Sequence, residues 1–185
     1  MNRRARIAGD LFYILVRRHQ ASSRMHTIPK AEYPSLVAGI AQETLKDPTF
    51  RRRLQALEPR VPIRDAFWPE AFALTFAAVG LALSSLPPQV ADLDGTVNEA
   101  TSLFLDATLN PDTPLEVQRQ ALVSLRARTK QYGAALRGDE PALAVWHLFR
   151  EATGADDWLD SAEFGLLVVP LVESLKVAYA QVRVV

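Results

Sequence analysis

Apolar residues recur along most of the chain at the spacing of an α-helix. In the segment 33–45 they lie three or four positions apart, at Tyr33, Leu36, Val37, Ile40, Ala41 and Leu45. This spacing places them on one face of a helix. The same periodicity continues through Phe50, Leu54 and Leu57, through Leu93, Val97, Ala100, Phe104 and Ala107, through Leu115, Leu122, Leu125, Tyr132 and Leu136, and through Leu143, Trp146 and Phe149. The pattern predicts a series of amphipathic helices.

Residues at the boundaries of these segments have the chemistry of helix ends. Asp47-Pro48 suits a helix start, because Asp accepts bonds from free amides and proline fits the first helical position. Thr113-Pro114-Leu115-Glu116 and Thr96-Val97-Asn98-Glu99 have the spacing of capping boxes. Gly138 and Gly154 follow apolar stripes and are predicted to end two helices. We therefore expect a succession of separate helices.

Two apolar stretches need a separate interpretation. The segment 71–91 has no charged residue, but its apolar part, 71–86, consists largely of small residues and stops at Pro87-Pro88. A membrane span needs about 20 strongly apolar residues, so we predict a buried core helix and no membrane span. The last segment, from about Asp160 to Val182, contains Pro170, which removes a backbone hydrogen bond. We predict a kink at Pro170 that can open a pocket.

The expected fold is all-α: a single compact bundle of about seven to eight helices over residues 1–185. A minor subdivision is possible near residues 58–66, which have the composition of a loop. For residues 1–24 the pattern does not distinguish a helix from a partial strand, because the apolar run Leu11–Val16 fits both. The rest of the chain has no convincing series of strands.

Composition narrows the function classes. The chain has no cysteine, which excludes disulfides and thiolate chemistry and is typical of a reducing compartment. We expect a soluble cytoplasmic protein without a cleaved signal. The net charge is zero, yet residues 1–64 hold 13 Lys or Arg against 5 Asp or Glu, and residues 65–185 hold 8 against 16. The opposite charges, +8 and −8, indicate either a basic binding surface or internal pairing.

One acidic motif, Asp92-Leu93-Asp94-Gly95-Thr96-Val97, resembles the first motif of the haloacid dehalogenase-type phosphatases. The resemblance implies that Asp92 is a nucleophile toward phosphorus, that Asp94 is a general acid/base, and that both hold Mg²⁺. That family places the motif after a buried strand, whereas Pro87-Pro88 precedes it here. Asp94-Gly95 is equally typical of a turn.

A second acidic motif, Asp156-Asp157-Trp158-Leu159-Asp160, resembles the diphosphate-binding motif of the helical isoprenoid synthases. The resemblance implies Mg²⁺ bound by Asp156, Asp157 and Asp160. Acidic side chains are also common in the first turn of a helix, where they offset the positive end of the helix dipole. The three histidines lack the partners of a metal site, and we predict no cofactor and no metal.

Arginines are the most extensive polar feature, and guanidinium groups suit anionic partners because they are planar, charged and bidentate. The candidate binding residues are Arg17, Arg18, Arg51, Arg52, Arg53, Arg60 and Arg64. We therefore predict a non-catalytic interaction module or complex subunit, with a basic surface from the first third of the chain. Its partner would be an unknown protein, a second copy, or an anionic partner such as nucleic acid. The alternative is a small Mg²⁺-dependent phosphoryl- or diphosphate-handling enzyme that uses one of the acidic motifs.

Overall fold

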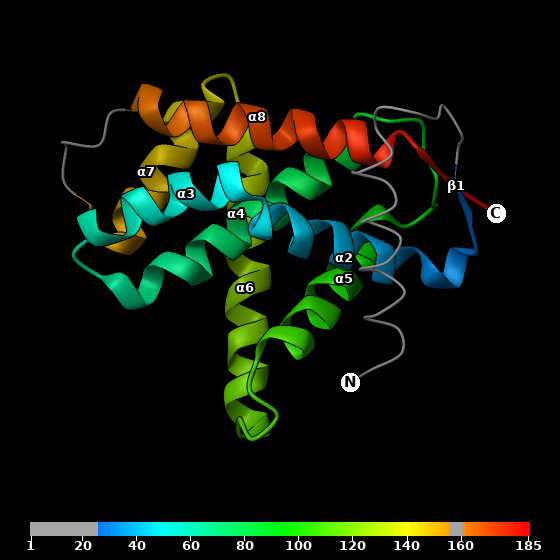
Figure 1. Ribbon diagram of the computed structural model, residues 1–185, viewed down its shortest axis with the longest axis horizontal. Helices are drawn as coiled ribbons and strands as arrows, with labels where there is room; N and C mark the ends of the chain where they lie inside the picture. Colours follow the sequence, from blue (N-terminus) through cyan, green and yellow to red (C-terminus); the bar gives the residue numbers. More distant parts are fainter. Residues whose placement is uncertain (1–25, 156–160) are drawn as a thin grey trace.

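The computed structural model describes residues 26–155 and 161–185, and within these ranges the chain is a bundle of seven α-helices with two short strands (Figure 1). The α-helices are α2 (Tyr33–Lys46), α3 (Pro48–Leu57), α4 (Arg64–Ser84), α5 (Leu93–Thr108), α6 (Leu115–Leu136), α7 (Pro141–Thr153) and α8 (Ser161–Tyr179). Two 3₁₀ turns, η2 (Lys30–Glu32) and η3 (Glu58–Arg60), precede α2 and α4. The predicted all-α fold class is confirmed.

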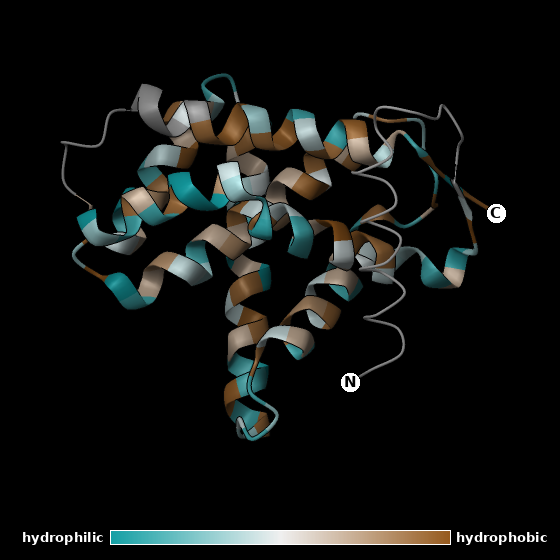
Figure 2. Ribbon diagram, viewed as in Figure 1, coloured by the Kyte–Doolittle hydropathy of each residue, from teal (hydrophilic) through white to brown (hydrophobic). Residues whose placement is uncertain are grey.

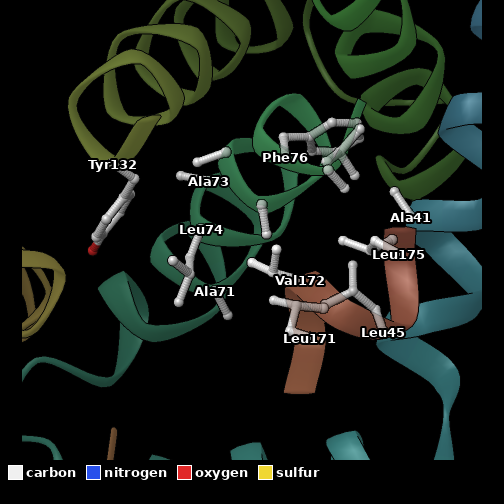
Figure 3. Packing of buried hydrophobic residues seen from close by; sticks show 14 of the residues in the cluster. Ala41, Leu45, Ala71, Ala73, Leu74, Phe76, Tyr132, Leu171, Val172 and Leu175 are labelled. Atoms are coloured by element: carbon white, nitrogen blue, oxygen red, sulfur yellow. The ribbon is translucent and has the colours of Figure 1, made fainter. Parts of the chain in front are cut away.

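Helix α4 forms the centre of the bundle. It packs against α2, α5, α6, α7 and α8, and its residues are buried on almost every side between Phe67 and Leu83. A helix that is apolar all round is stable only when other elements cover it completely. Figure 3 shows Ala71, Leu74 and Phe76 of α4 among side chains of α2 and α8. The predicted core helix is therefore confirmed.

Helix α4 begins earlier than the sequence pattern indicated. Arg64 already belongs to the helix, which continues through Pro69. Proline removes one amide donor, but at this position the loss is limited to the bond with the carbonyl of Asp65 near the helix start. The connection before α4 is therefore shorter than the predicted loop 58–66.

Helix α4 is also long and apolar enough to cross a membrane by length and composition, and 67% of its apolar window is buried inside the protein. No other helix within the described residues meets that test. Its neighbours in the bundle cover it as the core helices of folded domains are covered.

Helices α2 and α3 follow the predicted pattern closely. All six apolar positions predicted in α2 are buried, as are Phe50, Leu54 and Leu57 of α3. The Oδ1 atom of Asp47 accepts hydrogen bonds from the backbone amides of Thr49 (2.9 Å) and Phe50 (3.0 Å). The predicted cap of α3 is therefore confirmed.

Two other predicted caps are wrong. Helix α5 begins at Leu93, and Asp92 is its N-cap. Thr96 lies inside the helix, where its hydroxyl donates to the carbonyl of Asp92 at 2.8 Å. Helix α6 begins at Leu115 after Pro114, without a side-chain cap. In α5 the upstream residue Asp92 caps the helix before Thr96 can do so. In α6 the helix begins one residue later than a cap at Thr113 requires, and Pro114 occupies the N-cap position.

The first half of α6 and the end of α5 project from the rest of the bundle (Figure 1). Only part of the predicted apolar stripe of α6 is therefore buried. Leu125, Tyr132 and Leu136 are buried, whereas Leu115 is 78% exposed. Phe104 of α5 connects this region to α4, because its ring centroid lies 5.2 Å from that of Phe76, edge to face. Such aromatic pairs add to the stability gained from burial.

The two ends of the described chain meet in a small parallel sheet that the sequence pattern did not indicate. Strand β1 (His26–Ile28) pairs with β2 (Val182–Val184), and His26 lies opposite Val182. The last helix consequently ends at Tyr179 rather than near Val182. Three-residue strands contain too few positions for a period of two to be recognised.

Candidate functional site

The most exposed polar feature of α3 is its row of three arginines. Phe50, Leu54 and Leu57 face the core, and this orientation leaves Arg51, Arg52 and Arg53 in solvent. Figure 2 shows the outer side of α3 as strongly hydrophilic. The predicted outward orientation of these arginines follows from the apolar spacing alone.

Two further arginines, Arg60 at the end of η3 and Arg64 at the start of α4, are also exposed. We call Arg51, Arg52, Arg53, Arg60 and Arg64 the arginine surface. Across residues 26–155 and 161–185, the guanidinium groups of Arg51, Arg52 and Arg64 have no ion-pair partner. Arg17 and Arg18, also predicted as binding residues, lie outside the described residues. The arginine surface therefore presents positive charge to solvent.

The ion pairs that the structure describes do not join the basic and acidic halves of the chain. Each connects two residues of the same half: Lys46 with Glu43, Arg119 with Glu116, Arg128 with Glu70, and Lys176 with Glu173. Three of them are exposed pairs three residues apart on one helix, which contribute little to stability. These four pairs therefore leave the positive charge of Arg51, Arg52 and Arg64 uncompensated.

The motif at Asp92 serves as the start of a helix. The carboxylate of Asp92 accepts a hydrogen bond from the backbone amide of Gly95 at 2.7 Å. A Cβ atom on Gly95 would lie 2.1 Å from this carboxylate, so only glycine permits the cap in this form. Asp94 is exposed in the first turn of α5. Both carboxylates are thus placed where a helix N-terminus attracts negative charge.

Within the described ranges, no three His, Cys, Asp or Glu side chains lie close enough together to hold a metal ion. The second acidic motif, with Asp156, Asp157 and Asp160, lies outside the described residues. Among the residues that the structure describes, the geometry around Asp92 therefore includes no third acidic side chain that would complete a Mg²⁺ site.

A buried ionic cluster joins α4 to α6 and α7. The guanidinium of Arg128 donates from Nε to Oε1 of Glu70 (2.9 Å) and from Nη2 to Oε2 (2.7 Å). Nη2 also donates to the carbonyl of Leu148 in α7 at 2.9 Å. The hydroxyl of Tyr132 donates to Oε2 of Glu70 at 2.5 Å. Every polar group of Glu70 is therefore satisfied, as burial of a charge requires.

The electrostatics of the cluster follow from burial and charge. Burial, together with the charge of Glu70 and the hydrogen bond to it, raises the pKa of Tyr132 far above its usual range, and Arg128 offsets only part of that rise. Burial lowers the pKa of Arg128, but its hydrogen bonds to Glu70 outweigh that effect and raise the pKa. These shifts favour a neutral tyrosine and a charged arginine, and the hydrogen bonds of the cluster join α4 to α6 and α7.

Sequence reasoning did not identify this cluster. Glu70 immediately precedes the uncharged stretch of α4, and Arg128 lies 58 positions further along the chain. A lone carboxylate beside a stretch that must be buried is a usable signal, because a buried charge needs a partner. The identity of the partner depends on how α6 crosses α4.

A groove of about 570 Å³ lies between α3 and α8. Its apolar lining includes Phe50 of α3 and Leu167, Leu171 and Val177 of α8, and Pro170 lies along it. The predicted pocket beside Pro170 is therefore present. Polar side chains at its edges include Asp47, Thr49, Arg53, Glu173 and Ser174.

Comparison with known proteins identifies no relative: the chain matches no protein-family model, no curated protein and no solved structure. The arginine surface, the Asp92 cap, the Glu70 cluster and the groove are consequently interpreted from their own geometry. Of these four, the Glu70 cluster is largely buried, whereas the arginine surface, the Asp92 cap and the groove are accessible to solvent.

Proposed function

We propose that the chain is a non-catalytic helical interaction module, or a subunit of a complex, that presents the arginine surface to an anionic partner. The partner would be an acidic face of another protein or of a second copy, or a nucleic acid. The observation that carries the proposal is the exposure of Arg51, Arg52 and Arg64 without ion-pair partners in the described chain. Guanidinium groups in solvent retain all their donors for carboxylates and phosphates.

Two further observations support a binding role over a catalytic one. The carboxylate of Asp92 is engaged with the backbone of its own helix, which leaves less of it for a metal or a phosphoryl group. The arginine surface lies on helix α3, at the end of η3 and at the start of α4, and the buried side chains of Leu54 and Leu57 hold α3 against the core. A rigid scaffold limits the entropy that the surface loses on binding.

The test compares two variants that remove the same charge from different surfaces. In the first, Arg51, Arg52 and Arg64 are replaced by Gln; in the control, Arg119, Lys130 and Arg137 on the exposed side of α6 are replaced by Gln. Heparin and a short DNA duplex serve as anionic probes. The slope of log affinity against log salt should fall by about 3 for the first variant, roughly one for each lost contact.

The control variant should bind both probes as the wild type does, because its charges lie outside the arginine surface. Equal losses in the two variants would show that only net charge matters, and this outcome would contradict the proposal. Absence of binding to both probes, together with no self-association at high concentration, would exclude a nucleic acid and a second copy. An acidic face of another protein would then be the partner to test, by cross-linking.

A further inference from the structure

We propose that the groove between α3 and α8 is the docking site for an apolar segment of the same chain, residues 11–16. This segment, Leu-Phe-Tyr-Ile-Leu-Val, is followed directly by Arg17 and Arg18. It belongs to residues 1–25, which precede β1 and lie outside the described residues. The inference goes beyond the proposed function, since it concerns a contact within the chain rather than an external partner.

The groove presents apolar side chains to solvent. Its lining residues on α8 recur three or four positions apart, which places them on one face of the helix. Leu167 and Leu171 on this face are buried, whereas Pro170 is exposed and Val177 is 47% exposed. Phe50 of α3 also lines the groove. An apolar segment that covers this face removes it from water, which is energetically favourable.

The small sheet attaches the chain that precedes β1 to one end of the groove. His26, the first residue of β1, pairs with Val182 of β2, and Gln181, the residue before Val182, lines the groove. Paired strands lie about 4.8 Å apart. Because the two strands are parallel, the start of β1 lies at the end of the sheet nearest α8 rather than beside Val184 (Figure 1). The segment 11–16 is therefore tethered next to the groove.

The length of the tether lets the segment reach the whole groove. Residues 17–25 separate the segment from His26, and they can span at most about 30 Å. The lining of α8 from Leu167 to Ala178 extends over about 17 Å at the helical rise of 1.5 Å per residue. Short tethers give effective concentrations on the order of millimolar. The segment of the same chain therefore has an advantage over that of a second copy at lower concentration.

The charges of the groove and of the tethered segment are opposite. Residues 1–25 hold six arginines and one acid, Asp10, which gives a net charge of +5. Among the described residues, the lining holds two carboxylates, Asp47 and Glu173, against one arginine, Arg53. Glu173 is paired with Lys176 at 2.9 Å, but a carboxylate has about four acceptor positions. It can therefore also accept a hydrogen bond from an arginine that flanks the docked segment.

The test is disulfide trapping in the full chain, which has no cysteine of its own. Ser174→Cys in the groove is combined with Tyr13→Cys or with Ile14→Cys, so that two neighbouring positions of the segment are sampled. A disulfide forms only when the two Cα atoms come within about 7 Å of each other. In the control, Ser124→Cys on the exposed side of α6 replaces Ser174→Cys.

At least one pair with Ser174→Cys should form a disulfide within a monomer about tenfold or more faster than its control pair. Peptide mapping without reduction identifies the linked residues. Equal rates at the two serine positions would overturn the proposal. Disulfide-linked dimers would also overturn it, because they would place the segment in the groove of a second copy.

Accessibility of the groove gives an independent measurement. The thiol of Ser174→Cys alone should react slowly with a maleimide. Phe12→Asp with Leu15→Asp should raise this rate about tenfold or more, because burial of an unpaired charge in an apolar groove is unfavourable. Gln20→Asp with Ser23→Asp adds the same charge outside the segment and should change the rate much less. Equal effects of the two double variants would contradict docking of the segment.

A matched pair of variants tests the charge complementarity. Glu173 and Glu116 are both exposed, and each is paired with a cation three positions further along its helix. Glu173→Gln should raise the maleimide rate at Ser174→Cys about two- to fivefold, as the loss of an exposed ion pair implies. Glu116→Gln should leave the rate unchanged, and equal effects would contradict the assigned role of Glu173.

One further arm separates this docking site from the arginine surface. The variant lacking Arg51, Arg52 and Arg64 should form the disulfide at the same rate as the chain that retains these arginines. Failure of the proposed function therefore leaves the trapping result unchanged, and failure of the docking site leaves binding to heparin and DNA unchanged. A lost disulfide in this variant would contradict docking that depends on the groove alone.

Discussion

The carboxylate of Glu70 and the guanidinium of Arg128 meet in a two-point ion pair that joins the central helix α4 to α6, with a shortest distance of 2.7 Å. The two side chains are unequally buried: that of Glu70 is 8% exposed and that of Arg128 is 23% exposed. Loss of one partner of a buried pair leaves the other charge unpaired, and the cost grows with the burial of the remaining charge.

The first prediction concerns this asymmetry. Arg128→Met should destabilise the fold by about 3 kcal/mol, because Glu70 then stays buried with Tyr132 as its remaining partner. Glu70→Leu should cost less, because Arg128 can turn toward water. The double variant should recover much of the loss. Urea unfolding of the four proteins measures these differences, and additive effects in the double variant would show that the pair is not coupled.

The second prediction concerns alkaline pH. Burial raises the pKa of Tyr33 to about 12, and burial also raises the pKa values of Tyr132 and Tyr179 well above their usual value. An unfolded tyrosine ionises at about pH 10, so the unfolded chain loses protons that the folded chain keeps. Stability is therefore complete below pH 10 and falls above it.

Each of these tyrosines should contribute up to about 1.4 kcal/mol of lost stability per pH unit above its unfolded pKa. The ultraviolet absorbance of tyrosinate should rise together with the loss of helical circular dichroism. Tyr33→Phe should reduce the slope of the free energy of unfolding against pH, above pH 10, by the contribution of one tyrosine. Ionisation of all tyrosines near pH 10 in a folded chain would contradict the assigned burial.

The third prediction compares two glycines. Gly154 ends α7 with φ of +66°, and a Cβ there would lie 3.3 Å from Ile63 Cγ1. Gly154→Ala should therefore destabilise the fold by about 1 kcal/mol or more. Gly80 lies in α4 with no atom within 4 Å of an added Cβ, so Gly80→Ala should stabilise by about 0.5–1 kcal/mol. Thermal unfolding measures the change in stability of each variant. A change of the same sign in both variants would contradict this account.

The fourth prediction tests the role of Asp92. Asp92→Ala should cost about 1 kcal/mol because it removes the cap of α5, whereas Asp92→Asn should change stability by only a few tenths. We also expect Asp92→Asn to leave any Mg²⁺-dependent hydrolysis of phosphate esters at the level of the wild type. Loss of such an activity in this isosteric variant, with stability unchanged, would support the phosphatase alternative instead.

Much of the helical layout follows from residues that are close together in the chain. The periodicity in α2 and α3 and the cap at Asp47 were predicted, because apolar spacing and capping act over about four residues. The caps expected at Thr96 and Thr113 were wrong for an equally local reason. Asp92 offers a competing cap upstream, and Pro114 precedes α6 without one. Leu93, the first residue of α5, packs against the core directly after this cap.

The candidate sites also include features that local sequence predicts and features that it does not predict. The outward orientation of Arg51, Arg52 and Arg53 could be predicted, because three apolar neighbours determine which face of α3 is buried. A pocket near Pro170 was expected from a kink, and Pro170 does line the groove between α3 and α8. Its second wall could not be predicted, since nothing in α8 specifies that α3 packs beside it.

The amino-acid sequence alone determined that most of the described chain is helical, where α3 begins, and which face of α3 carries the arginines. All of these depend on residues within one or two turns of each other. Tertiary structure decided that Glu70 pairs with Arg128, that β1 joins β2 at the ends of the described chain, and that α3 and α8 enclose a groove. These relationships connect residues far apart in sequence, and they arise only when the helices pack to bury their apolar faces.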